Sequence, residues 1–142
     1  MAKPMTDAEW RSFLTSGTRT GKLATTRADG SPHVVPIWFV LDGDDVVFNT
    51  GETSVKGRNL ARDPRATICV DEEVAPYAYV IVRGRATLSS DLGGMREWST
   101  RIAERYMGAE RADEYGARNA VAGELLVRLR IERVSGYTGI AD

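Results

Sequence analysis

The spacing of apolar residues along the chain separates helical from extended segments. Near the start, Trp10 and Leu14 share one face of a helical pattern, and Thr6 and Glu9 have the spacing of an N-terminal capping box. Gly17 follows, and glycine commonly stands just beyond a helix. The pattern therefore predicts a short first helix between Thr6 and Gly17.

Six later segments have the apolar pattern and the flanking turn residues of β-strands. They span residues 21–26, 33–41, 46–50, 65–71, 77–88 and 124–134. Asp-Gly pairs at 29–30 and 42–43 predict tight hairpin turns. The segment 33–41 is apolar on both faces, so we expect it to be covered on both sides. Within it, Pro36 marks an edge, a bulge or a close approach of another group, and Gly84 predicts a bend or bulge further along.

Helical pieces lie between these strands. Ser54 predicts the cap of a helix over 55–62, and Pro64 ends it because proline disfavours helix at the preceding residue. Asp91 opens another helical region, with a further piece around 111–118. This order predicts a mainly β (α+β) fold, a closed six-stranded antiparallel β-barrel with peripheral helices.

Composition narrows the function classes without naming one. The chain has one histidine, His33, one cysteine, Cys69, and a formal net charge of -1. These counts exclude a disulfide framework, a Cys-cluster or multi-His metal centre and a Cys-His nucleophile, and they give no overall basic surface for nucleic acid. No apolar run approaches the roughly 20 residues of a membrane span, and the start lacks a signal-peptide core. We expect a single cytoplasmic domain over residues 1–142, without metal, nucleic acid or membrane insertion.

The segment from Thr50 to Arg65 carries the most informative chemistry. A strand ends, a small polar turn follows, and a helix begins with Lys56 in its first turn. Free backbone N–H groups and the positive end of a helix dipole suit an anion, and the hydroxyls of Thr53 and Ser54 add donors. Nearby basic residues add positive charge: Lys56, Arg58, Arg62 and Arg65. The alternative interpretation is a capped surface helix with a solvated basic face.

Three stretches in order resemble the pyridoxamine 5′-phosphate oxidase-like split β-barrel superfamily. They are Gly21–Trp38, which resembles its first hairpin, Lys56–Thr67 with the following strand to Asp71, and Val82–Ala86, which resembles its long strand of the form x-G-x-A. The resemblance covers nearly the whole chain and implies a split β-barrel. The chain is most similar to short actinobacterial members that use the deazaflavin coenzyme F420. FMN-type members carry an Arg-x-x-x-Leu-Lys run where this chain has residues 37–41, and that run is absent here.

The resemblance also implies a homodimer with two cofactor sites at the subunit interface. By position, the stretch expected to line the deazaflavin ring is His33, Val34, Val35, Pro36, Ile37 and Trp38. The residues expected at the phosphate, the linker and the anionic tail are Thr50, Gly51, Thr53, Ser54, Lys56, Gly57, Arg58 and Asn59. Three residues are expected to approach from the other subunit: Pro76, Tyr77 and Tyr79.

No side chain stands out as a catalytic group, so the chemistry is expected to come from a cofactor. The resulting hypothesis is an F420-dependent oxidoreductase that transfers a hydride from the reduced deazaflavin to a conjugated or quinone-like small molecule. Tetrapyrroles, quinones and unsaturated lactones all fit. Two alternatives remain open: an FMN-dependent oxidase or reductase on the same barrel, and a non-catalytic dimer that binds a deazaflavin, flavin or haem-like ligand.

Overall fold

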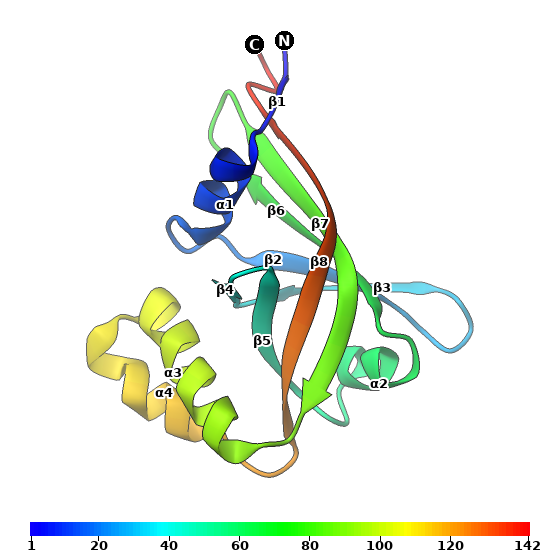
Figure 1. The fold of residues 1–142 in the computed structure, drawn as a ribbon, viewed down its shortest axis with the longest axis vertical. Coiled ribbons are helices and arrows are strands. Elements are labelled where there is room, and N and C mark those ends of the chain that lie inside the picture. Colours follow the sequence, from blue (N-terminus) through cyan, green and yellow to red (C-terminus); the bar gives the residue numbers. More distant parts are fainter.

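The computed structural model describes the whole chain, from Met1 to Asp142. The strands are β1 (Lys3–Pro4), β2 (Gly21–Thr26), β3 (Pro32–Ile37), β4 (Val40–Asp42), β5 (Asp45–Gly51), β6 (Arg65–Glu72), β7 (Ala78–Ser89) and β8 (Glu124–Thr138). The helices are α1 (Asp7–Thr15), α2 (Val55–Arg62), α3 (Leu92–Met107) and α4 (Ala112–Asn119), with a 3-10 turn, η1 (Ala109–Arg111), before α4 (Figure 1). None of these helices is long and apolar enough to cross a membrane.

All strands pair antiparallel in one sheet, which confirms the predicted mainly β fold with peripheral helices. The hydrogen-bonded order is β3-β2-β6-β7-β8-β5-β4, and β1 adds to β8. The sheet has eight strands rather than the expected six, because β1 was not predicted and the segment 33–41 forms two strands, β3 and β4. The order leaves β3 and β4 each paired on one side only, so the barrel is split, as the resemblance implies, and is not closed all the way round.

The break between β3 and β4 comes from contacts with helix α3. The Phe39 N–H donates to the Tyr106 hydroxyl at 3.3 Å, and the Phe39 carbonyl accepts from Arg105 at 2.7 Å. Helix α3 therefore holds both backbone groups of Phe39, which cannot join a strand ladder at the same time. Within the single chain one face of β3 is open, since Val34 on this edge strand is 60% exposed, so the expected cover on both sides of the segment stays a prediction. Pro36 lies on this edge, one of the three positions expected for it.

Local sequence signals set the other boundaries. Thr6 and Glu9 form the predicted capping box of α1. Gly30 and Gly43 have the positive φ angles that their tight hairpin turns need. The predicted irregularity at Gly84 is a register shift between β7 and β8, where the backbones approach so closely that a Cβ on Gly84 would lie 2.1 Å from the Arg130 carbonyl oxygen.

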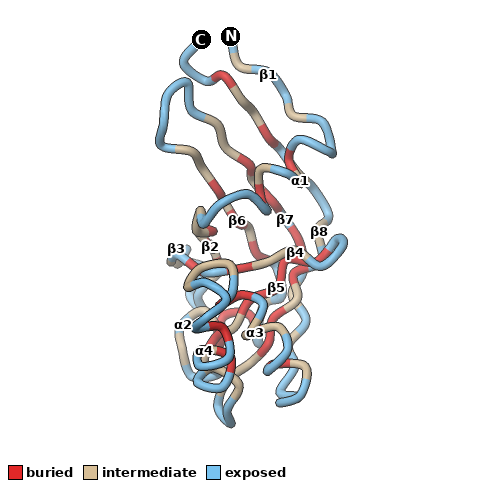
Figure 2. Tube along the Cα trace, turned by 90° about the vertical axis from the view of Figure 1, so that its left-hand side faces the viewer, coloured by how far each residue is buried: buried red, intermediate tan, exposed pale blue.

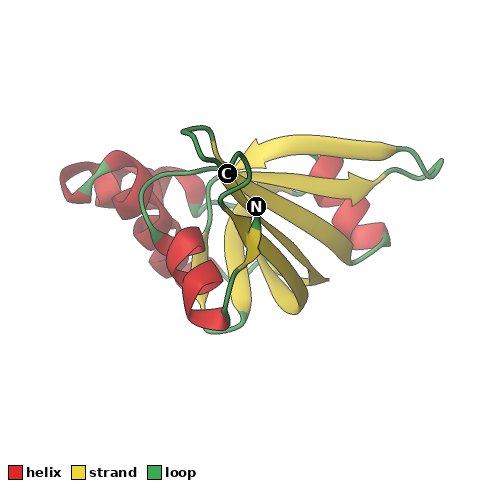
Figure 3. Cartoon of the chain, turned by 90° about the horizontal axis from the view of Figure 1, so that it is seen from above, coloured by secondary structure: helices red, strands yellow, loops and turns green.

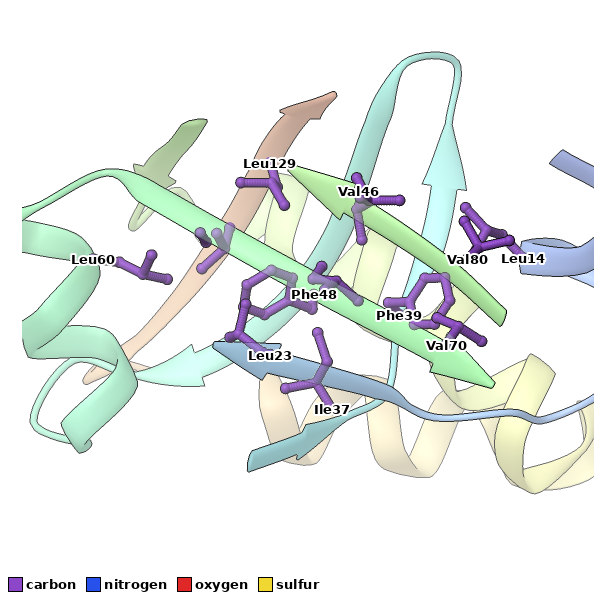
Figure 4. Close-up of a cluster of buried hydrophobic side chains, with 14 of the residues drawn as sticks. Leu14, Leu23, Ile37, Phe39, Val46, Phe48, Leu60, Val70, Val80 and Leu129 are labelled. Carbon is purple, nitrogen blue, oxygen red and sulfur yellow. The ribbon is translucent and has the colours of Figure 1, made fainter. Parts of the chain in front are cut away.

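Two apolar clusters lie on opposite faces of the sheet. The larger one fills the barrel and includes Phe39, Phe48 and Leu23 (Figure 4). The smaller one joins Val47 and Leu126 to Met95 of α3, so this helix covers the outer face of β5 and β8. Figure 2 shows the buried residues running through the sheet, and Figure 3 shows the helices at its margins.

The long strands β7 and β8 span the molecule from end to end (Figure 1). The two termini and the β6–β7 turn lie at one end, and α2, α3 and α4 lie at the other. The residues predicted to bind the cofactor are divided between these two ends.

Candidate functional site

A cleft of about 300 Å³ opens at the helical end of the molecule. It lies where the end of β3 meets β5 and three of the helices. Its lining residues are Pro36, Ile37, Trp38, Asn49, Lys56, Ile102 and Asn119. They supply one cation, two amides and an apolar and aromatic wall, a set that suits the binding of a flat ligand with a negatively charged group.

The start of α2 forms the polar side of this region. The Ser54 hydroxyl accepts from the Gly57 N–H at 3.0 Å, donates to the Gly51 carbonyl at 2.7 Å and lies 2.8 Å from the Thr50 hydroxyl. Gly57 is required for this arrangement, because a Cβ there would lie 2.2 Å from the Gly51 carbonyl oxygen. The polar turn is therefore a fixed capped helix start, and Thr53 beside it is exposed.

Two of the four basic side chains in this segment are already engaged. Arg65 forms an ion pair with Asp63 at 2.8 Å, and Arg62 donates to the Thr26 carbonyl and to the Asn59 amide. The hydrogen bonds from Arg65 hold the pKa of the Asp63 carboxyl at about 2.

Lys56 and Arg58 take part in none of the salt bridges of the chain. Lys56 is half-buried in the wall of the cleft, and Arg58 is exposed beside it on the same helix. These two cations are therefore available to an anion in a way that Arg62 and Arg65 are not.

Asn59, predicted at the anionic tail of the cofactor, has its side chain inside the fold. It is 3% exposed, and its amide donates to the Thr25 hydroxyl at 3.0 Å. Together with the hydrogen bond from Arg62 to the Thr26 carbonyl, this contact ties α2 to β2. The structure thus gives Asn59 a part in holding α2 against the barrel.

The predicted ring-lining stretch divides between two faces of β3. His33, Val35 and Ile37 pair with Thr25, Leu23 and Gly21, whose side of the sheet is buried, whereas Val34 and Pro36 point outward. Only the last part of the stretch, from Pro36 to Trp38, reaches the cleft.

Two buried polar atoms in this part of the molecule have no hydrogen-bond partner: Nδ1 of His33 and Nδ2 of Asn49. Such atoms are uncommon in folded proteins. Asn49 is fixed through its other amide atom, because its Oδ1 accepts from the buried Ser99 hydroxyl at 2.8 Å. Asn49 therefore brings an unsatisfied amide to the wall of the cleft.

The residues predicted to come from a partner subunit lie at the opposite end of the molecule. Tyr77 and Tyr79 line a separate depression of about 350 Å³ with Ile140 and a run of acidic residues, and Pro76 is exposed in the turn before them. The chain does not bring them to the cleft, so their role across a subunit interface stays a prediction.

Sequence reasoning missed three lining residues, Asn49, Ile102 and Asn119. Asn49 could have been noticed, because it is the one amide within the apolar strand that precedes the polar turn. Ile102 and Asn119 carry no such signal, since their place depends on how α3 packs against the sheet and α4 against α3.

Comparisons with known proteins agree with this fold and bear on its chemistry. The sequence model of the family described as pyridoxamine 5′-phosphate oxidase matches residues 6–137. The F420H(2)-dependent biliverdin reductase of Mycobacterium tuberculosis (strain CDC 1551 / Oshkosh) is 30% identical over 120 residues, which are 84% of this chain and 80% of that protein.

Two solved structures are similar over most of both chains. A conserved hypothetical protein of Mycobacterium tuberculosis superimposes with a TM-score of 0.83 at 26% identity, covering 95% of this chain and 86% of that one. A structure described as an F420 reductase has a TM-score of 0.73 at 26% identity, covering 87% of this chain and 94% of that one.

Proposed function

The chain belongs to the pyridoxamine 5′-phosphate oxidase family, and on that premise we propose that it is an oxidoreductase that uses coenzyme F420 to reduce a conjugated small molecule. The observation that carries the proposal is the cleft itself, which the unpaired Lys56 and the aromatic side chain of Trp38 both line. A ligand with a flat ring and a phosphate-bearing tail needs both features.

The residues of the cleft fit such a ligand. Lys56 and Arg58 would hold the phosphate and the anionic tail beside the capped start of α2, where the helix dipole adds to their charge. Ile37 and Trp38 would contact the ring, and Nδ2 of Asn49, which has no partner in the chain, is a donor close to the same wall.

The family relationship indicates the reaction class. When bound, the reduced deazaflavin supplies a hydride for transfer to an electron-poor double bond or a quinone-like carbon. The cleft lining contains no carboxyl, imidazole or thiol group. The part we assign to the side chains of the cleft is therefore to bind and orient the ligands. One relative is described as a biliverdin reductase, which makes a tetrapyrrole the first acceptor to examine.

We also propose that the working form is a homodimer in which Tyr77 and Tyr79 of one subunit approach the cleft of the other. The exposed edge strand β3 supports this proposal, because Val34 and Trp38 beside the cleft are 60% and 38% exposed in the single chain. Light scattering should give twice the chain mass. A monomer at the concentrations that support coenzyme binding would refute this arrangement.

The activity test is anaerobic mixing of the protein with reduced F420 and biliverdin, followed by the return of oxidised coenzyme absorbance. A quinone and an unsaturated lactone serve as further acceptors. We expect protein-dependent oxidation of the coenzyme with at least one of them, and weaker oxidation at the same coenzyme concentration with Lys56→Ala. Absence of oxidation with every acceptor, despite bound coenzyme, would leave a carrier as the better interpretation.

A further inference from the structure

The position of Trp38 depends on helix α3 rather than on the sheet. The ladder of β3 ends at Ile37 and that of β4 begins at Val40, so no strand pairing fixes the two residues between them. The ring of Tyr106 instead lies parallel to the Trp38 ring, with centroids 5.1 Å apart and an interplanar angle of 3°. Offset parallel rings at this distance attract each other.

Tyr106 is itself fixed from two directions. Its hydroxyl donates to the Arg19 carbonyl at 2.9 Å and accepts from the Phe39 N–H at 3.3 Å. Burial raises the pKa of the Tyr106 hydroxyl, so it remains a protonated donor near neutral pH. The preceding residue, Arg105, holds the Phe39 carbonyl at 2.7 Å, and consecutive residues of α3 thereby fix the turn that carries Trp38.

The stack leaves part of the indole uncovered. Trp38 is 38% exposed although one side of its ring lies against Tyr106, and it lines the same cleft as Lys56. We infer that Tyr106 is a positioning residue: it holds the Trp38 ring so that its uncovered face receives the flat conjugated part of a ligand in the cleft. The identity of that ligand rests on the proposed function, whereas the hold of Tyr106 on Trp38 does not.

Two substitutions separate the ring of Tyr106 from its hydroxyl. Tyr106→Leu removes the stacked ring and both hydrogen bonds of the hydroxyl, whereas Tyr106→Phe keeps the ring and removes only the hydrogen bonds. Tyr115→Leu is the matched control, because Tyr115 is a half-buried tyrosine on α4 that contacts Arg111 and Arg118 and does not line the cleft.

The first measurement uses the ligand-free protein. In a background with Trp10→Phe and Trp98→Phe, Trp38 is the only tryptophan, and acrylamide quenching of its fluorescence reports its exposure. We expect quenching to rise in Tyr106→Leu and to stay at the background level in Tyr115→Leu. If the background does not fold, acrylamide quenching of the otherwise native chain gives the same comparison, because Tyr106→Leu should add quenching that Tyr115→Leu does not. An unchanged signal overturns the inference, whatever the coenzyme proves to be.

The second measurement is a titration with oxidised F420. We expect Tyr106→Leu to weaken binding by about 2- to 10-fold, the effect of losing an aromatic stack, with Tyr106→Phe nearer the native affinity. Trp38→Leu should have a similar effect, and the double variant should bind no worse than the weaker single variant, because both changes remove one platform. If the losses of affinity in the two single variants multiply in the double variant, the inference is overturned. A merely structural role for Tyr106, separate from Trp38, predicts that result. Absence of binding by the native chain would refute the proposed function, while the quenching result would still decide whether Tyr106 holds Trp38.

Discussion

Replacing Lys56 with alanine should lower the affinity for the coenzyme while leaving the stability of the fold almost unchanged. The lysine ammonium group forms no salt bridge, and its side chain is half-buried at the wall of the cleft. No internal ion pair is lost in Lys56→Ala, and alanine is at least as favourable in a helix as lysine. The free energy of unfolding should therefore change by no more than about 0.5 kcal/mol.

The effect on affinity should be much larger. A hydrogen bond to a charged group contributes about 1.5–3 kcal/mol, which corresponds to a loss of roughly 10- to 150-fold in affinity for a phosphate-bearing ligand. If Lys56 binds the phosphate, added salt should lower the affinity of the native protein for F420 more than that of Lys56→Ala. The variant has already lost one of the charged contacts that salt screens.

Fluorescence titration with F420 measures the affinity, and urea unfolding measures the stability. Lys3→Ala is the control, because it removes the same charge from β1 at the far end of the molecule (Figure 1). An affinity for Lys56→Ala within twofold of the Lys3→Ala value would mean that Lys56 is a solvated surface residue, and the account of the cleft would be wrong.

Three further predictions concern the parts that hold the site in place. Gly57→Ala should destabilise the protein by about 1–3 kcal/mol in urea unfolding, because the new Cβ would lie 2.2 Å from a backbone oxygen. Gly51→Ala is the control and should change stability little, since no atom lies within 4 Å of its Cβ. Equal effects of the two substitutions would contradict this geometry. Arg105→Met removes three hydrogen bonds to carbonyls, at 2.7, 2.7 and 2.9 Å, and should cost about 2–4 kcal/mol in the same assay, a loss that a surface arginine would not show. The Asp63 carboxyl has its pKa lowered from 3.8 to about 2 by the hydrogen bonds from Arg65, so the stability it contributes is complete above about pH 4 and lost as pH falls through 2. Acid unfolding of Asp63→Asn should depend less on pH in that interval, and an unchanged profile would show that the ion pair adds nothing to stability.

Signals carried by neighbouring residues predicted the local structure well. The limits of α2 were found because Ser54 caps its start and Pro64 prevents its continuation. The register shift at Gly84 and the hairpin glycines were found because close backbone approach and positive φ angles favour glycine. The resemblance between sequences, and not their periodicity, supplied the split-barrel assignment and the hypothesis of an F420 cofactor.

Features that depend on distant contacts were missed. Nothing in the apolar run 33–41 shows that Arg105 and Tyr106, far along the chain, take the backbone groups of Phe39 and divide the run into two strands. Nor does the run show that its two parts become the two edge strands of the sheet, β3 and β4. The resemblance placed Asn59 at the cofactor by position, and its contact with Thr25, which holds α2 against β2, was not foreseen. The pattern of a single sequence does not indicate which distant residues will be in contact.

The most direct test of the proposed function is an equilibrium titration of the purified chain with oxidised coenzyme F420 and, in parallel, with FMN, followed by ligand fluorescence. The account predicts saturable F420 binding that is clearly tighter than FMN binding and is weakened by Lys56→Ala. Tight binding of FMN with weak binding of F420 would place the protein with flavin-dependent oxidases or reductases. Binding of neither would contradict the proposed redox function and leave only the fold and the family.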